Sequence, residues 1–227
     1  MASSATTPPL TWRTSVDVSA EATASGKAQK EEFICSTDPA LLQLDALSDA
    51  LASELLWWAQ PLDAETLQIL VQSSVCIGLY HTATDDTKHD TPKMVGFSRL
   101  VTDRVTFAYL TDVYVLPEFQ KRGLGAWMVR CLRELVAGTD GAPSKNGGEN
   151  GPLREWAKLR SLWLLCTTPI VANMYTKALG MECVARYRSQ PGVPDSGQFL
   201  LEMRGPANAL KHYAQRSNDA SGWKADN

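Results

Sequence analysis

The sequence lacks the features of several large classes of protein. It has only three histidines, and no histidine and cysteine form a pair at a metal-binding spacing, so we expect no metal ion. The formal net charge is −3, which gives no overall basic field to attract nucleic acid. No apolar run approaches the roughly 20 residues that cross a bilayer, and no apolar signal segment opens the chain. These absences predict a cytoplasmic protein without membrane or nucleic-acid partners, although a nuclear location stays open.

What is present suits one globular domain. The chain has 227 residues, 44% of them hydrophobic. Its five cysteines are odd in number and far apart, which is typical of reduced thiols. Hydrophobic periodicity is missing at the two ends and in one Gly/Asn/Pro-rich stretch. We therefore expect a flexible leader over 1–30, one domain over 31–205 with a mobile insertion at 138–152, and a polar tail over 206–227.

Hydrophobic periodicity predicts the element order β-α-α-β-β-β-α-β-α-β-β, with the first helix over 39–57 and the last over 169–179. The strands before the helix at 123–136 form a meander. The strand that precedes this helix and the strand that follows the insertion are joined by a helical crossover, which favours a parallel pair. The pattern indicates a mixed sheet with helices on both faces.

The turn QKRGLG, 120–125, has the character of an anion site. A helix N-terminus presents unpaired N–H groups and partial positive charge, and Gly123 and Gly125 let a ligand approach the backbone closely. Lys121 and Arg122 add positive charge, so a diphosphate would fit. On the glycines alone, a plain strand-to-helix connection is equally compatible. No Walker string occurs, and the dinucleotide fingerprint is incomplete because Met128 stands at its third position.

Two ordered motifs carry a resemblance to a family. VYVLPEFQKRGLGAWM resembles the acetyl-CoA site of the GNAT N-acetyltransferases, V-x-P-x-x-Q/R-x-x-G-x-G/A. The matches are Val115, Pro117 (shifted by one residue), Gln120, Gly123 and Gly125. TTPIVANMYTKALGM resembles the N-x-x-A-x-x-x-Y-x-K-x-x-G-F segment of the same family, with matches at Ala172, Tyr175, Lys177 and Gly180. Thr168 and Met181 depart from that pattern. The resemblance extends over about residues 32–204.

The resemblance implies an α/β (α+β) fold, the GNAT acyl-CoA N-acyltransferase fold. Its mixed sheet of about six to seven strands has a splayed parallel pair, here 105–116 and 160–167. Acetyl-CoA would be the cosubstrate, with its pantetheine arm along the gap and its pyrophosphate on the glycine turn. The cofactor-binding residues implied in this way are Val113, Tyr114, Val115, Gln120, Lys121, Arg122, Gly123, Leu124, Gly125, Ala126, Thr168, Tyr175 and Lys177.

The resemblance also implies a mechanism, in which an amine attacks the thioester directly and Tyr175 protonates the departing thiolate. Asp112, an acid in an apolar strand, is our candidate for a base or an ammonium anchor. A structural role, paired with an arginine or at a bulge, is at least equally open. The acceptor would contact Trp58, Arg99, Tyr109 and Asp112, in an aromatic-lined cleft that also includes Phe97 and Phe107. We expect only one of the adjacent Trp57 and Trp58 to face the core, and the resemblance favours Trp58 on the pocket side.

These observations favour acetyl transfer to a primary amine of a small molecule. Two alternatives stay open at this point: a protein or peptide N-acetyltransferase, and a CoA-binding sensor without catalysis. A homodimer is an expectation from family analogy alone.

Overall fold

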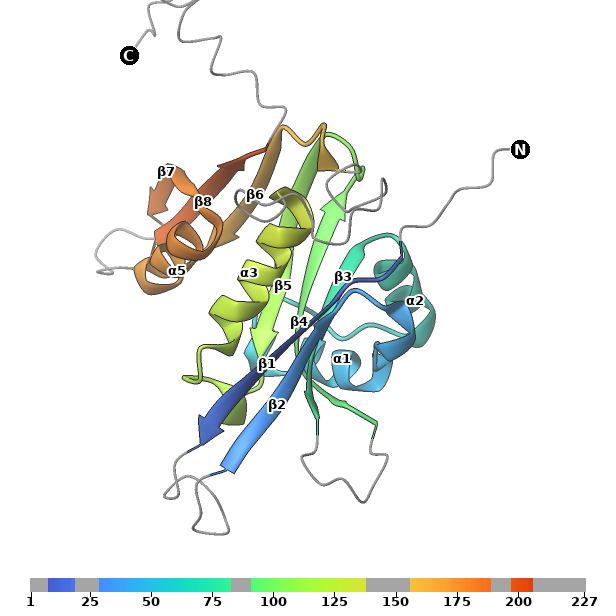
Figure 1. Ribbon diagram of the computed structural model, residues 1–227. Coiled ribbons are helices and arrows are strands. Elements are labelled where there is room, and N and C mark those ends of the chain that lie inside the picture. Colours follow the sequence, from blue (N-terminus) through green and yellow to red (C-terminus); the bar gives the residue numbers. More distant parts are fainter. Residues whose placement is uncertain (1–7, 19–28, 83–90, 138–155, 189–196, 206–227) are drawn as a thin grey trace, which may run out of the picture.

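The computed structural model describes residues 8–18, 29–82, 91–137, 156–188 and 197–205, in which eight strands form one sheet (Figure 1). The strand order is β1-β2-β3-β4-β5-β6-β8-β7. The strands are β1 Thr11–Val18, β2 Gln29–Ser36, β3 Val75–Thr82, β4 Lys93–Thr102, β5 Phe107–Val115, β6 Ser161–Cys166, β7 Glu182–Arg188 and β8 Gly197–Arg204. The helices are α1 Leu44–Leu51, α2 Ala64–Gln72, α3 Leu124–Ala137 and α5 Pro169–Leu179, with 3-10 turns η2 Pro39–Leu41, η3 Glu54–Leu56 and η4 Pro117–Phe119. From β2 onward, this is the predicted order.

The prediction of a flexible leader is wrong for residues 11–18, which form the edge strand β1. This strand pairs antiparallel with β2 over its whole length. Trp12 and Val16 pack against the main core, and the Trp12 Nε1–H donates to Glu134 Oε2 at 2.7 Å. The extra strand raises the count above the predicted six to seven. The expected insertion at 138–152, the tail over 206–227 and the rest of the leader lie outside the described residues, except for 8–10 and 29–30.

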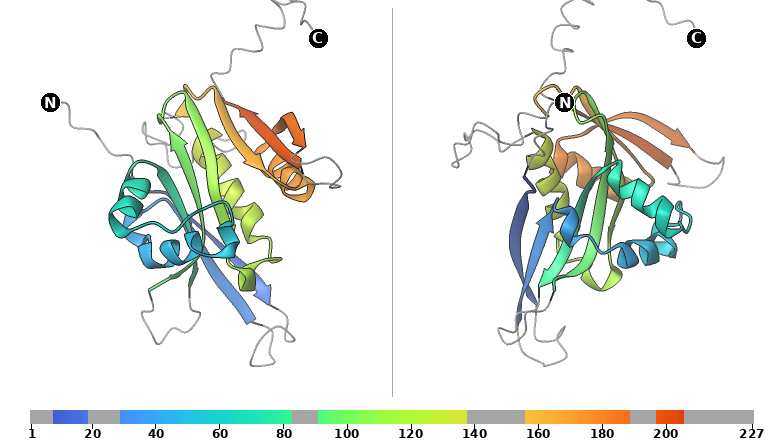
Figure 2. Two further views of the ribbon diagram at one scale, coloured as in Figure 1. Left: turned by 180° about the vertical axis from the view of Figure 1, so that it is seen from behind. Right: turned by 90° about the vertical axis from the view of Figure 1, so that its right-hand side faces the viewer.

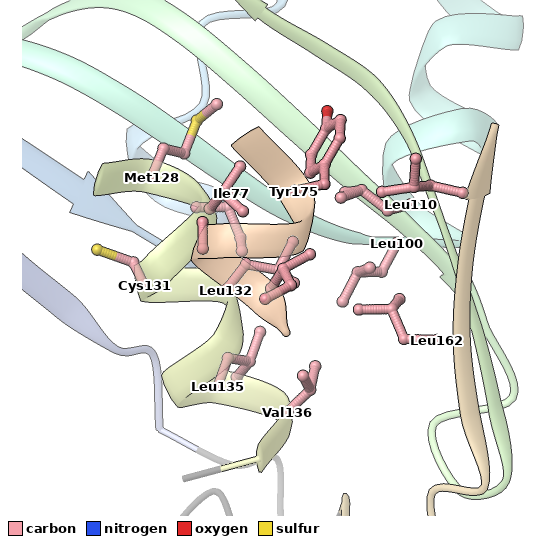
Figure 3. Packing of buried hydrophobic residues seen from close by; sticks show 14 of the residues in the cluster. Ile77, Leu100, Leu110, Met128, Cys131, Leu132, Leu135, Val136, Leu162 and Tyr175 are labelled. Atoms are coloured by element: carbon pink, nitrogen blue, oxygen red, sulfur yellow. The ribbon is translucent and has the colours of Figure 1, made fainter. Parts of the chain in front are cut away.

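Helices cover both faces of the sheet, as predicted (Figure 2). The main hydrophobic core lies between the sheet and the pair α3 and α5, and a second core lies under α1 and α2. Figure 3 shows the first core, where Met128, Leu132, Leu135 and Val136 of α3 face the sheet. The two buried faces hold the central strands in place from both sides.

The predicted first helix is interrupted, and the interruption positions two tryptophans. The Ser53 hydroxyl donates to Ala50 O at 2.8 Å and accepts from Leu55 N–H at 3.2 Å, so it ends α1 and begins η3. Leu56 is fully buried and anchors this turn in the second core. Trp57 and Trp58 follow at once and stay exposed.

The predicted parallel pair is confirmed as β5 and β6, and it separates after three residues. The pairing consists of Phe107, Ala108 and Tyr109 of β5 against 161–163 of β6. Beyond that point β5 carries an extra residue relative to β4, and Asp112 has a left-handed φ of 51°. A bulge of this kind bends a strand and ends its pairing. The bulge therefore accounts for the gap between the two central strands.

Candidate active site

The turn before α3 presents backbone N–H groups at the open end of the gap. Lys121 and Gly123 have φ values of 62° and 77°, and the Gln120 side chain fixes the turn by donating from Nε2 to Val115 O at 2.8 Å. The helix starts at Leu124, with Gly123 O accepting from Trp127 N–H at 3.0 Å. The N–H groups of residues 124–126 lie in the first turn, so they have no acceptor within the helix. Such N–H groups, with the helix dipole behind them, are suited to an anion.

The two glycines of this turn serve different purposes. Gly123 adopts a backbone conformation that side-chain-bearing residues rarely take, so the turn itself requires it. Gly125 lies in regular helix, and a Cβ there would meet only Val115 Cγ2, at an ordinary 3.8 Å. The protein alone therefore has no steric need for glycine at 125. A phosphate ligand binds where it can come close to the backbone N–H groups of a helix N-terminus, and glycine at this position allows that close contact.

The Arg122 side chain, expected to add positive charge to the anion site, is engaged by other groups of the protein. Its Nη1 forms an ion pair with Glu31 Oε2 at 2.7 Å, and its Nη2 donates to Glu118 O at 2.8 Å. The guanidinium also lies 5.1 Å from the centre of the Phe119 ring. His81 Nε2 lies 3.4 Å from the same Glu31 oxygen, and burial lowers the pKa of His81. Arg122 thus ties the turn to β2, and only its backbone is available to a ligand.

We expect Arg122→Ala to change the Kd for CoA by less than about threefold, because the charge that it removes already has a partner. The same substitution should lower the free energy of unfolding by about 1 kcal/mol through the lost ion pair and ring contact. Calorimetric titration with CoA and a thermal melt measure the two effects. Lys121→Ala is the matched comparison, because it removes from the same turn an exposed charge that has no partner among the described residues. A tenfold loss of CoA affinity in Arg122→Ala would return Arg122 to the binding site.

The main chain of β5 is open toward the gap beyond Tyr109. Leu116 N–H donates to Val95 O at 2.8 Å, so backbone groups of alternate residues point toward β4 and toward β6. By this alternation Val113 and Val115 face the gap. The side chain of Tyr114 is buried in the second core beside Phe97, at 6.2 Å between ring centres. Val113 and Val115 thus keep their predicted positions, whereas Tyr114 lies away from the gap.

A pocket of about 350 Å³ occupies the gap, and its walls come from both faces of the sheet. Tyr175 of α5 belongs to the α3 and α5 side, and Trp57 and Trp58 belong to the α1 and α2 side. Between them lie residues of the two separated strands. The other lining residues are Tyr109, Leu110, Thr111, Asp112, Val113, Leu164, Leu165, Cys166, Thr167, Val171 and Gln198. Two molecules could meet here from opposite sides.

Tyr175 is nearly enclosed, with 5% of its surface exposed. In Figure 3 its hydroxyl points out of the hydrophobic cluster, and the residue lines the pocket. Burial, together with the nearby Cys166, raises the pKa of Tyr175 well above its usual value. Burial also raises the pKa of Cys166 to about 11, so both groups are neutral at physiological pH. The phenol therefore carries a proton that it can donate.

The helix that carries Tyr175 is fixed by local signals. The Thr168 hydroxyl accepts from Val171 N–H at 3.2 Å, Pro169 stands in the first turn, and Gly180 ends the helix with a φ of 69°. Thr168 thus caps the helix, and its neighbour Thr167 lines the pocket in its place. Lys177 is exposed in the last turn and is not part of the pocket wall.

Asp112 is held by Arg99. Arg99 Nη2 and Nε lie 2.6 and 2.8 Å from Asp112 Oδ2, and the Thr111 hydroxyl donates to Oδ1 at 3.2 Å. Arg99 Nη1 also donates to Ser74 Oγ at 3.2 Å. Asp112 lines the pocket, whereas Arg99 lies behind it. Asp112 therefore has the structural role that the sequence left open, because it pairs with an arginine and lies at a bulge.

We expect Asp112→Asn to lower the free energy of unfolding by about 2 kcal/mol, because it leaves a largely buried guanidinium without its counter-charge. Chemical denaturation measures this loss. In a double-mutant cycle, Arg99→Met combined with Asp112→Asn should cost less than the sum of the two single changes. Additive costs would show that the pair does not hold the bulge.

Sequence comparison decides the family. The model of the Acetyltransferase (GNAT) family matches residues 45–145. The Gibberella zeae protein "Putative acetyltransferase FG08082" is 37% identical over 171 residues, which are 71% of this chain and 86% of that protein. The chain belongs to the GNAT acetyltransferase family. It is accordingly an enzyme of acetyl-CoA-dependent acetyl transfer, as predicted.

Solved structures are similar to this GNAT chain at low sequence identity. A "putative acetyltransferase belonging to the gnat family" from Xanthomonas campestris is 24% identical, with 64% of this chain and 81% of that chain covered and a TM-score of 0.45. Arabidopsis thaliana NAA60 in complex with acetyl-CoA is 12% identical, with 74% and 95% covered and a TM-score of 0.47.

The residues of this GNAT chain fit the parts of acetyl-CoA. The helix N-terminus and Gly125 suit the pyrophosphate, the open main chain of β5 suits the pantetheine arm, and the pocket at Tyr175 suits the thioester. Among the described residues, no group of three or more His, Cys, Asp and Glu side chains could hold a metal ion. No helix in the described part of the chain has the length and apolarity to span a membrane.

Sequence reasoning missed part of the GNAT pocket. Trp57 and Trp58 both line it, because they follow a 3-10 turn and neither enters the core. Leu165 and Val171 were also missed, since an all-apolar strand and a helix start do not reveal which side chains face a cavity. Phe97 and Phe107, expected in an aromatic cleft, lie elsewhere: Phe97 is fully buried, and Phe107 packs edge-on against Trp163.

Proposed function

We propose that this GNAT acetyltransferase transfers the acetyl group to a primary amine of a small molecule, by direct attack in a ternary complex. The observation that carries the proposal is the pocket through the splayed sheet, lined by Tyr175 on one face and by Trp57 and Trp58 on the other. Acetyl-CoA would enter along β5 from the turn at α3, and the amine would enter past the tryptophans. The two molecules then meet without a covalent enzyme intermediate.

We attribute each step of the proposed transfer to a residue of the pocket. The neutral amine nitrogen attacks the thioester carbon, the carbon–sulfur bond breaks, and the sulfur leaves as CoA thiolate. The nitrogen gives its extra proton to water, and water later returns a proton to Tyr175. Tyr175 donates its proton to that thiolate, which its raised pKa and enclosed position favour. Backbone N–H groups beside the bulge at Asp112 would stabilise negative charge on the acetyl oxygen. Asp112 lines the pocket with Oδ2 in its ion pair with Arg99 and Oδ1 bonded to the Thr111 hydroxyl, so we assign it as an ammonium anchor rather than as a base.

The size of the pocket supports a small acceptor. Its volume of about 350 Å³ lies at the lower end of the range for small-molecule sites. The thioester end of acetyl-CoA must share this space with the acceptor. A short amine fits that requirement more readily than a folded peptide segment does.

The proposal is tested by thiol release from acetyl-CoA with a panel of small amines and N-terminal peptides. We expect measurable kcat/KM for small primary amines and at least about tenfold less for the peptides. Turnover confined to peptides would contradict the small-molecule proposal and indicate a protein or peptide N-acetyltransferase. Tight CoA binding without turnover on any acceptor would support a sensor.

A further inference from the structure

Four exposed apolar side chains line the pocket, two of them in the turn after η3, one on β6 and one at the start of α5. Trp57 and Trp58 are 63% and 49% exposed, and Leu165 and Val171 are 40% and 37% exposed. The two indole rings contact each other edge-on, with 5.6 Å between their centres. Converging exposed apolar surface of this kind marks a site for an apolar ligand, because such surface is otherwise kept from water.

The charge of the pocket limits the acceptor further. Among the described residues that line it, Asp112 is the one acidic side chain, and Arg99 already neutralises it. The remaining polar lining consists of the neutral side chains Thr111, Thr167, Gln198 and two tyrosines. A second ammonium group on the acceptor would therefore lose its hydration shell without gaining a counter-charge from this lining, and this desolvation would weaken binding.

We propose that the acceptor is an apolar monoamine, with one reactive amine and an aliphatic or aromatic body packed against Trp57 and Trp58 after η3, Leu165 of β6 and Val171 of α5. This inference rests on the proposed function, since it specifies the acceptor class of the same site. The amine points inward toward Asp112 and Tyr175, and the apolar body points outward. Diamines and longer polyamines are excluded from the preferred class, because their distal ammonium would lie against the apolar walls.

A matched pair of ligands tests the inference without requiring catalysis. 1-Heptylamine and 1,6-diaminohexane have the same chain length, and they differ only in a terminal methyl or ammonium group. We expect heptylamine to bind the CoA-saturated protein at least about tenfold more tightly in calorimetric titration. Equal binding, or tighter binding of the diamine, would overturn the monoamine class. The same pair in the thiol-release assay then reports turnover, so a failure of catalysis is seen separately from a failure of the acceptor class.

Side-chain variants test whether Trp58 contacts the acceptor. Trp58→Ala should raise KM for 2-phenylethylamine about tenfold and leave the Kd for CoA within about threefold. Ile170→Ala is the matched control, because Ile170 is apolar and 83% exposed but does not line the pocket. An equal rise of KM in both variants would remove the tryptophan wall from the acceptor site.

A charge-introducing variant provides a gain of function that a destabilised protein would not show. Leu165→Glu places an acid on the β6 wall of the pocket, and we expect it to shift the heptylamine-to-diaminohexane ratio of kcat/KM by about tenfold toward the diamine. If the binding pair favours heptylamine but the ratio does not move in Leu165→Glu, the apolar body does not lie along that wall and the proposed orientation is wrong.

Discussion

Replacement of Tyr175 by phenylalanine is expected to lower kcat by about 10²-fold or more, with the Kd for acetyl-CoA unchanged within about threefold. The substitution removes only the hydroxyl, which lines the pocket, and keeps the ring that packs in the core. The CoA thiolate then leaves without its proton donor. Steady-state thiol release and calorimetric titration give the two constants.

The control for this prediction lies in the same pocket. Tyr109→Phe also removes a phenol from the wall. As an expected acceptor contact, Tyr109 should affect KM for the amine, but the variant should retain most of kcat because that strand position is not matched to the leaving group. The direction of the Tyr175 pKa adds a pH test. A general acid works while it is protonated, so a raised pKa places any activity loss from its ionisation above about pH 10. Unchanged kcat in Tyr175→Phe, or a loss shared equally by Tyr109→Phe, would remove Tyr175 from the proton transfer.

Gly125→Leu is expected to weaken acetyl-CoA binding by about 10²-fold without lowering stability. The side chain would project where the pyrophosphate must approach the first turn of α3. The folded protein has room for a Cβ at this position, and leucine is a better helix former than glycine. Calorimetric titration should therefore show weaker CoA binding. Chemical denaturation should show a free energy of unfolding that is unchanged or raised by up to about 1 kcal/mol.

Gly123 provides the comparison for Gly125. Gly123→Ala forces a side chain into a left-handed conformation, at about 1 kcal/mol of stability. Gly125→Ala should leave stability intact and weaken CoA binding about tenfold. Tight CoA binding in Gly125→Leu would mean that the pyrophosphate lies elsewhere, and the turn would then be a plain connection between β5 and α3.

Local sequence signals were sufficient for the parts of this protein whose conformation is set within a few residues. Helix α5 begins and ends where the sequence predicts, because the Thr168 cap, Pro169 and the left-handed Gly180 are all short-range determinants. The glycine turn is of the same kind. The chain order also indicated a parallel central pair, since a strand–helix–strand crossover has few solutions.

Long-range packing decided the rest. Arg122 has a charge that suits a phosphate, but the tertiary structure places Glu31, 91 residues away, beside it. Asp112 in an apolar strand indicated a site, and the fold brings Arg99 from the adjacent strand to pair with it. The alternating pattern of residues 11–18 is too short to predict a strand. They form a strand because the edge of β2 offers backbone hydrogen-bond partners along their length. The sequence by itself determined the family, the anion turn and the helix of Tyr175, because backbone preferences act locally. Only the tertiary structure decided which charges are neutralised and which apolar side chains face the pocket, because these depend on residues far apart in the chain.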